Sequence, residues 1–338
     1  MSEMAKTKPP SGAEMRKWNQ REIGLDRSVV QSLCRRSDTK GLIYFLGWLA
    51  LTIGAGFLLH LSLGSLLVVP AMMLYGAILV FSYPMSHETA HGTAFRRRWL
   101  NEAVFWFTSL IYGQEPNYRR FSHATHHTHT AIHGLDSQMA WQHPLTLGGY
   151  LEKISGIDQV VRFPALCMRH ATGNLPDAVK AFTPQREWPR LIWGARLFLG
   201  IHLGLIAGFA LAGVWWVPFV FLYLPRIIGG PLTNNVFDVT QHAEMREEVL
   251  DMRENTRSVR TNQFTNFIYS NMSYHLEHHL YPTVPFHALP ALNREIGDRL
   301  PEPSPGFYYT NVQILRAIMG RMRESTAEIT HSSESRVP

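Results

Sequence analysis

The sequence has very few cysteines. Only Cys34 and Cys167 occur among its 338 residues, so the chain lacks the four thiolates of a four-cysteine zinc site, a rubredoxin centre or an iron–sulfur cluster. One disulfide between them is conceivable, but so low a content favours free thiols in a reducing compartment. Any metal site in this chain must therefore use other side chains.

Charged residues are absent from one long stretch. No Asp, Glu, Lys or Arg occurs between Lys40 and Glu88. A helix needs about 20 apolar residues to cross a bilayer core. The stretch therefore predicts two spans, at about 42–60 and 64–84, joined by the turn HLSLGS (60–65).

A second apolar block runs from Leu191 to Pro225. It is short for two spans and long for one, and it predicts a hairpin at about 191–211 and 215–232, with Trp215 at the far interface. The sequence thus predicts an all-α integral membrane protein. Four transmembrane helices form two hairpins, and the polar segments outside them form a helical cap.

The basic residues predict the orientation of the chain. The net charge is +6, and Arg96, Arg97 and Arg98 directly follow the first hairpin, whose tip carries no Lys or Arg. By the positive-inside rule both termini and the cap are cytoplasmic. A membrane surface therefore explains the net positive charge of the chain, and no nucleic-acid partner is predicted. About 40 mostly polar residues precede the first span, which is not typical of a signal peptide. The predicted divisions are a partly disordered segment 1–40, a membrane domain 41–295, and a segment 296–338 with a disordered tail.

Histidine is abundant, with 17 residues. The motif HETAH at 87–91 resembles the zinc site of metalloproteases, in which two histidines one helical turn apart bind the metal beside a glutamate base. Two further motifs, HATHH and HLEHH, repeat the pattern H-x-x-H-H, which places three rings on one helical face. Together these are more imidazoles than one zinc can bind, so two metals sharing them explain the pattern better. The clustered histidines are His87, His91, His123, His126, His127, His275, His278 and His279.

These motifs, in this order and each following a predicted hairpin, resemble the membrane fatty acid desaturase and hydroxylase superfamily. The flanking sequences HGTAFRRRWLN (91–101) and NMSYHLEHHLYPTVP (271–285) agree, and the resemblance covers roughly residues 40–295. It implies two non-haem iron ions, dioxygen as co-substrate and a ninth histidine, which His242 matches. Relatives can have an asparagine four residues before that histidine, where this chain has Asp238.

Carboxylates near the histidines are candidates to orient the ligands through hydrogen bonds. They are Glu88, Asp136, Asp238, Glu244 and Glu277. Each is equally compatible with an exposed surface acid.

The predicted function is an oxidase that uses dioxygen to desaturate an apolar acyl or lipid chain at the cytoplasmic membrane face. Electrons would come from a ferredoxin, rubredoxin or similar carrier with its reductase. Hydroxylation of an alkyl, acyl or other hydrophobic substrate at the same site is the alternative. Two remoter hypotheses are a membrane zinc protease using His87, Glu88 and His91, and a histidine-rich protein that only binds or transports metal.

Overall fold

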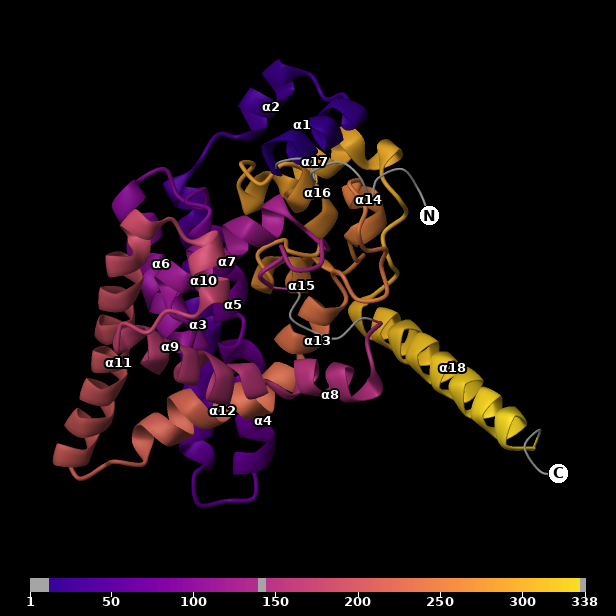
Figure 1. The fold of residues 1–338 in the computed structure, drawn as a ribbon. Coiled ribbons are helices and arrows are strands. Elements are labelled where there is room, and N and C mark those ends of the chain that lie inside the picture. The colour runs from indigo at the N-terminus through magenta and orange to yellow at the C-terminus, as the bar shows by residue number, and fades with distance from the viewer. Residues whose placement is uncertain (1–11, 139–143, 335–338) are drawn as a thin grey trace.

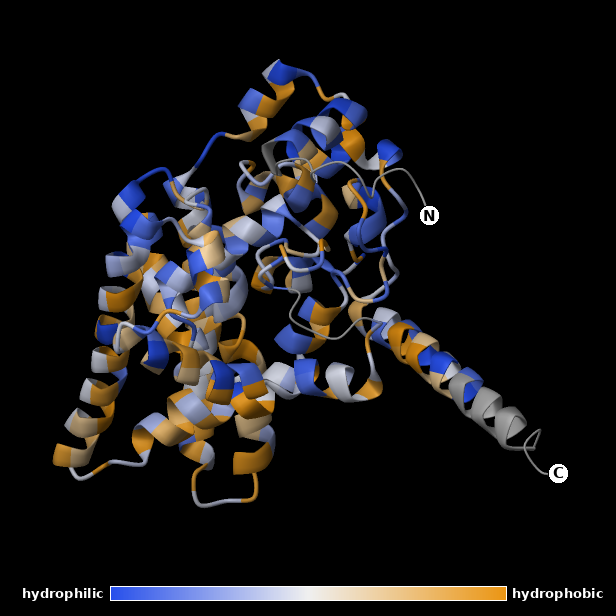
Figure 2. Cartoon of the chain, viewed as in Figure 1, coloured by the Kyte–Doolittle hydropathy of each residue, from blue (hydrophilic) through white to orange (hydrophobic). Residues whose placement is uncertain are grey.

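The computed structural model describes residues 12–138 and 144–334, and within these ranges it is helical, with one isolated β-bridge between Val259 and Ser304. Long apolar helices gather at one end of the molecule and shorter, more polar helices form a cap at the other (Figures 1 and 2). The all-helical prediction is confirmed. The predicted disorder of the first dozen residues falls largely on residues 1–11, outside the described chain, whereas a final helix, α18 (Phe307–Glu334), extends through most of the predicted disordered tail.

Within the described residues, three helices are long and apolar enough to cross a membrane: Asp38–Ser62, Val68–Ala90 and Gln185–Leu211. They correspond to the first three predicted spans. The first, α3 (Asp38–Ser62), begins where the Ser37 side chain accepts a hydrogen bond from the backbone N–H of Lys40. Much of its surface faces outward, and Phe57 and Leu61 are 60 % and 65 % exposed. An apolar surface of this extent indicates a lipid environment.

The second candidate span consists of α4 (Val68–Leu79) and α5 (Ser82–Ala90), and the third is mostly α11 (Trp188–Leu211). The predicted fourth span, 215–232, corresponds to a shorter apolar segment, Phe219–Leu232. This segment is divided into a π-helix η4 (Phe219–Tyr223), α12 (Leu224–Gly229) and a 3-10 turn η5 (Gly230–Leu232). Its 14 residues would rise about 21 Å, less than the roughly 30 Å of a bilayer core.

The cap is built from short helices on both sides of α11 in the sequence. α6 follows the first hairpin and precedes α7, while α13 and α16 follow the second apolar block (Figure 1). The cap elements are α1 (Gly12–Ile23), α2 (Arg27–Leu33), α6 (Arg98–Tyr112), α7 (Pro116–Thr128), α8 (Leu147–Ser155), η2 (Asp158–Arg162), α9 (Phe163–Ala171), α10 (Asp177–Phe182), α13 (Asn234–Val239), α14 (Met252–Asn255), α15 (Gln263–Ile268), α16 (His275–Leu280), η6 (Phe286–Ala288), α17 (Leu289–Ile296) and η7 (Gly297–Arg299).

A buried apolar cluster holds α16 in place. Leu276 and Leu280 of α16 pack with Leu289 and Leu292 of α17 and with Phe95, which follows α5. All five side chains are at most 2 % exposed. The cluster therefore joins the segment after the first hairpin to the helix that carries the last histidine motif.

The apolar helices α4 and α12 pack backbone to backbone at a pair of glycines. A Cβ atom added to Gly229 would lie 1.9 Å from the carbonyl carbon of Gly76, and one added to Gly76 would lie 2.5 Å from the carbonyl oxygen of Pro225. Small residues allow this close approach of apolar helices.

We expect Gly229→Ala to destabilise the protein by about 1–3 kcal/mol, because the added methyl group forces the two helices apart. Thermal unfolding in mild detergent measures the effect. The matched control is Gly208→Ala in α11, where no heavy atom lies within 4 Å of the added Cβ. Equal stability of the two variants would contradict the close packing.

Candidate metal centre

The nine predicted histidines converge in two buried groups. The nitrogen atoms that could bind an ion lie within 4.8 Å of one another in each group. The groups are adjacent, since the rings of His127 and His279 stack with their centroids 4.1 Å apart. The first group is His87, His91, His123, His127 and His278, and the second is His126, His242, His275 and His279.

The spacing H-x-x-H-H distributes each helical triad between the two groups. On α7, His123 and His127 join the first group, whereas His126 joins the second. On α16 the pattern is reversed: His275 and His279 join the second group and His278 joins the first. The first and last histidine of each motif are four residues apart and therefore lie close together on one face of the helix. The middle histidine, three residues after the first, is rotated to the other side of that face. Each motif therefore bridges the two groups.

Local structure fixes the helices that present these rings. α5 continues the second apolar helix, and it has His87 in its last turn and His91 at its C-cap. α7 begins where the Glu115 side chain accepts hydrogen bonds from the backbone N–H groups of Asn117 and Tyr118. His87 and His91 thus lie at the end of α5, and the three histidines of HATHH lie in the second half of α7.

Hydrogen bonds from the outer nitrogen orient several rings. His126 Nδ1 lies 2.9 Å from the Asp136 carboxylate, and His87 Nδ1 lies 2.9 Å from Glu88. Burial alone would raise the pKa of Asp136, but the His126 ring and two backbone N–H groups lower it below its ordinary value. An ionised Asp136 accepts the proton of His126 Nδ1 and leaves its Nε2 free to bind a metal.

The second group has more nitrogen lone pairs than protons to share. His242 Nδ1 lies 3.0 Å from the Asn255 carbonyl, which only accepts, so its Nε2 is unprotonated. His279 Nδ1 lies 3.1 Å from the Thr130 hydroxyl, which already donates to a backbone carbonyl. The Nε2 atoms of both rings lie 3.1 Å from Nε2 of His275, which can donate only one proton. This arrangement fits a cation at the point of convergence.

The first group shows the same arrangement. His123 Nε2 lies 2.9 Å from Nε2 of His91 and 3.0 Å from Nε2 of His127. Its Nδ1 faces the amide oxygen of Gln138 at 3.2 Å. Among the residues that the structure describes, His278 has no hydrogen-bond partner on either nitrogen. Buried, unpartnered imidazole nitrogens fit a metal-binding site.

Burial keeps the rings of His91 and His242 neutral. Burial, together with nearby positive charge, lowers the pKa of His91 and of His242 to about 3. Neutral imidazole is the form that binds metal, so these two rings do not have to lose a proton to bind one near neutral pH.

The five carboxylates considered from the sequence occupy different positions. Glu88 and Asp136 bond to histidine rings. Asp238 accepts a hydrogen bond from the Tyr83 hydroxyl at 3.0 Å and lines the neighbouring cavity. Glu277 accepts hydrogen bonds from Ser258 and Asn293. Glu244 pairs with Arg321 of α18.

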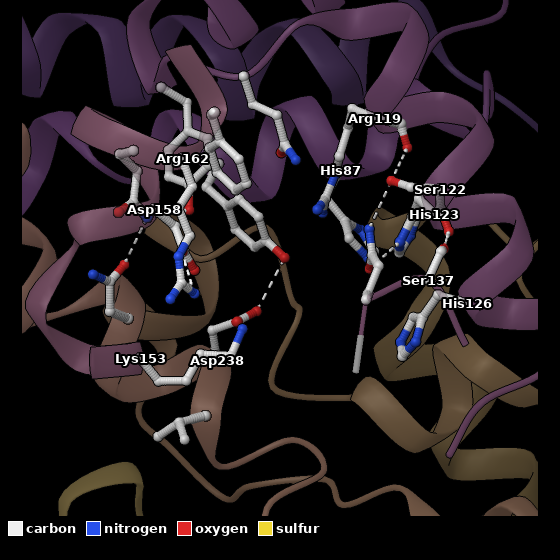
Figure 3. Close-up of a pocket in the computed structure, with 18 of the residues that line it drawn as sticks. His87, Arg119, Ser122, His123, His126, Ser137, Lys153, Asp158, Arg162 and Asp238 are labelled. Carbon is white, nitrogen blue, oxygen red and sulfur yellow. Dashed lines mark hydrogen bonds and ion pairs between the residues drawn. The ribbon is translucent and has the colours of Figure 1, made fainter. Parts of the chain in front are cut away.

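A cavity of about 690 Å³ adjoins the histidines. His87, His123 and His126 lie on one side of it, and Lys153, Asp158 and Arg162 lie on the other (Figure 3). Phe163 and Leu166 of α9 add apolar surface to the lining. The cavity is a place for a substrate in direct contact with the metal-binding wall.

Sequence reasoning missed several residues that shape the site. Thr130 and Gln138 bond to histidine rings and lie just beyond HATHH, so their position close to the motif was an available signal. Asn255 contacts His242 through its backbone carbonyl, so its residue type gives no signal in the sequence. Arg119 lines the cavity four residues before His123, on the same face of α7.

Comparison with known proteins identifies the class of this chain. The model of the fatty acid desaturase family matches residues 63–311, well over half of the chain. The chain belongs to this family, and its two histidine groups could hold metal ions. It is also similar to the Delta(5) fatty acid desaturase fat-4 of Caenorhabditis elegans, with 22 % identity over 229 residues, 60 % of this chain and 51 % of that protein. The chain thus spans about half the length of this curated relative.

We expect Asp136→Asn to weaken metal binding by roughly 10- to 100-fold, because an amide supplies no negative charge to His126. Competition with a chelator measures the affinity. The control is Asp177→Asn, since the Asp177 side chain is 99 % exposed and pairs with Lys180 rather than with a histidine. Unchanged affinity in the Asp136 variant would show that this carboxylate does not support a ligand.

Proposed function

We propose that this protein is an O2-dependent diiron oxidase that desaturates an apolar acyl chain at the cytoplasmic face of a membrane. The observation that supports it best is the pair of adjacent histidine groups, with five and four rings. A single catalytic zinc uses three protein ligands, so a one-metal enzyme would leave most of these rings without a role.

The donor set fits iron, and we propose all nine histidines as its ligands. Imidazole binds zinc, copper, iron and nickel alike, so the choice of iron depends on membership in the desaturase family. Two irons would supply dioxygen activation for removing hydrogen from an unactivated C–H bond, which no protein side chain can perform. The chain's own residues bind and orient the metals and shape the cavity.

Four membrane crossings are part of the proposal. Each histidine group combines residues that precede α11 with residues that follow it. If α11 spans the bilayer, the chain must return before His242 to complete the second group. The apolar segment Phe219–Leu232, packed against α4 at Gly229, is the candidate for this return. The basic residues beside the cap favour a cytoplasmic location for the site and both termini.

We propose that electrons come from a ferredoxin, a rubredoxin or a similar carrier with its reductase. The two free cysteines, Cys34 and Cys167, cannot hold an iron–sulfur cluster. Arg96 and Arg97, whose side chains are 74 % and 60 % exposed, form a basic surface suited to an acidic carrier.

Hydroxylation of an alkyl, acyl or other hydrophobic substrate is the alternative at the same site. Both reactions begin with removal of hydrogen from a C–H bond, and the name of the similar nematode protein favours desaturation. The zinc-protease hypothesis is disfavoured because three further histidines surround His87 and His91. Glu88 also bonds to His87 and lies 3.8 Å from His278.

Metal analysis of protein purified anaerobically in mild detergent tests the proposal. We expect close to two irons per chain in the wild type and a large loss in His278→Ala, because the first group loses an inner nitrogen donor. The matched control is His170→Ala, since His170 is equally buried but outside both groups. Cellular lipid profiles with and without the active protein would then separate desaturation from hydroxylation. One zinc per chain, retained in His278→Ala, would overturn the oxidase proposal.

A further inference from the structure

Arg119 is a buried cation on the wall of the cavity. The residue is 4 % exposed and lines the cavity together with His87 and His123. Its Nε and Nη2 atoms have no hydrogen-bond partner among the residues that the structure describes. Arg162, on the opposite wall, instead forms ion pairs with Glu152 and Asp158. Burying a guanidinium without hydrogen-bond partners is unfavourable unless a ligand supplies them.

The two unpartnered atoms lie on the same edge of the guanidinium group. Nε–H and the adjacent Nη2–H point in parallel, and this edge matches the two oxygens of a carboxylate. The face of the group is already occupied, because the Arg119 Cζ atom lies 4.6 Å from the centre of the Tyr83 ring. Tyr83 is itself fixed through its hydroxyl, which donates to Asp238. This edge, the fork of Nε–H and Nη2–H, is therefore held in position while its hydrogen-bonding capacity remains unused.

We propose that Arg119 binds the free carboxylate of the substrate inside the cavity. An ester or thioester would offer one carbonyl oxygen and leave one N–H group unpaired, whereas a carboxylate satisfies both and neutralises the buried charge. Arg119 precedes His123 by four residues of α7, a rise of about 6 Å. The acid group is thereby held beside the metal-binding wall, and Phe163 and Leu166 provide apolar surface for the chain.

This inference names the substrate class of the proposed oxidase and rests on that proposal, but acid binding is measurable without turnover. We suggest equilibrium binding of radiolabelled decanoate to the full-length, iron-loaded protein in mild detergent under anaerobic conditions. Unlabelled straight-chain acids from butanoate to hexadecanoate, and their methyl esters, serve as competitors. We expect the best acid to compete far more strongly than its ester.

Variants assign the preference to Arg119. Arg119→Gln removes the charge and the fork, and should weaken acid binding by roughly 100-fold, the loss typical of a buried charged pair. Arg119→Lys keeps the charge without the fork and should lose roughly 10-fold. The matched control is Arg120→Gln, because Arg120 pairs with Glu102 and does not line the cavity. It should bind acids as the wild type does.

The proposal would be overturned if the wild type did not bind decanoate, or if acids and esters competed equally. It would also be overturned if inorganic phosphate competed as strongly as the acids, or if the preference for acids persisted in Arg119→Gln. The wild-type comparison and Arg119→Lys still decide if Arg119→Gln does not fold. Iron content is measured on each preparation. Acid binding by a wild type that contains no iron would sink the oxidase proposal alone, which keeps the two failures distinct.

Discussion

The convergence of unprotonated imidazole nitrogens is the constraint on which the rest of the structure depends. Neutral rings whose lone pairs meet near 3 Å, as those of His242 and His279 do around His275, are stable only when a cation or a shared proton lies between them. Hydrogen bonds to the outer nitrogens enforce this arrangement. The Asn255 carbonyl and the Thr130 hydroxyl each fix a tautomer. The folded cap thus favours a bound metal before any substrate enters.

Keeping nine rings in register requires several helices to meet with little freedom. α7 and α16 each contribute to both histidine groups, so a shift of either helix would disturb two sites at once. The apolar cluster of Leu276, Leu280 and Leu289 resists such a shift by packing α16 against α17. Burial has a second effect, since it lowers the pKa of cap histidines such as His91. The core that positions the ligands also keeps rings such as that of His91 neutral.

Much of the fold and of the centre was predictable, because both depend on spacing along helices. Apolar runs predicted the three candidate spans Asp38–Ser62, Val68–Ala90 and Gln185–Leu211. The i, i+3, i+4 motifs predicted rings on shared faces, and the structure gathers all nine. The fourth helix was less predictable: hydropathy ignores the π-turn and prolines that break the segment before Leu232. Contacts through backbone groups, such as the Asn255 carbonyl, leave no pattern in the sequence.

Two apolar segments that pack against each other each lead to one of the two histidine groups. The second apolar helix, Val68–Ala90, ends with His87, which belongs to the first group. The last apolar segment, Phe219–Leu232, leads through α13 to His242, which belongs to the second. The backbones of these two segments approach each other closely at Gly76 and Gly229. The close packing of these apolar helices therefore holds together two segments that each lead to a histidine of the centre, so this packing contributes to the geometry of the centre.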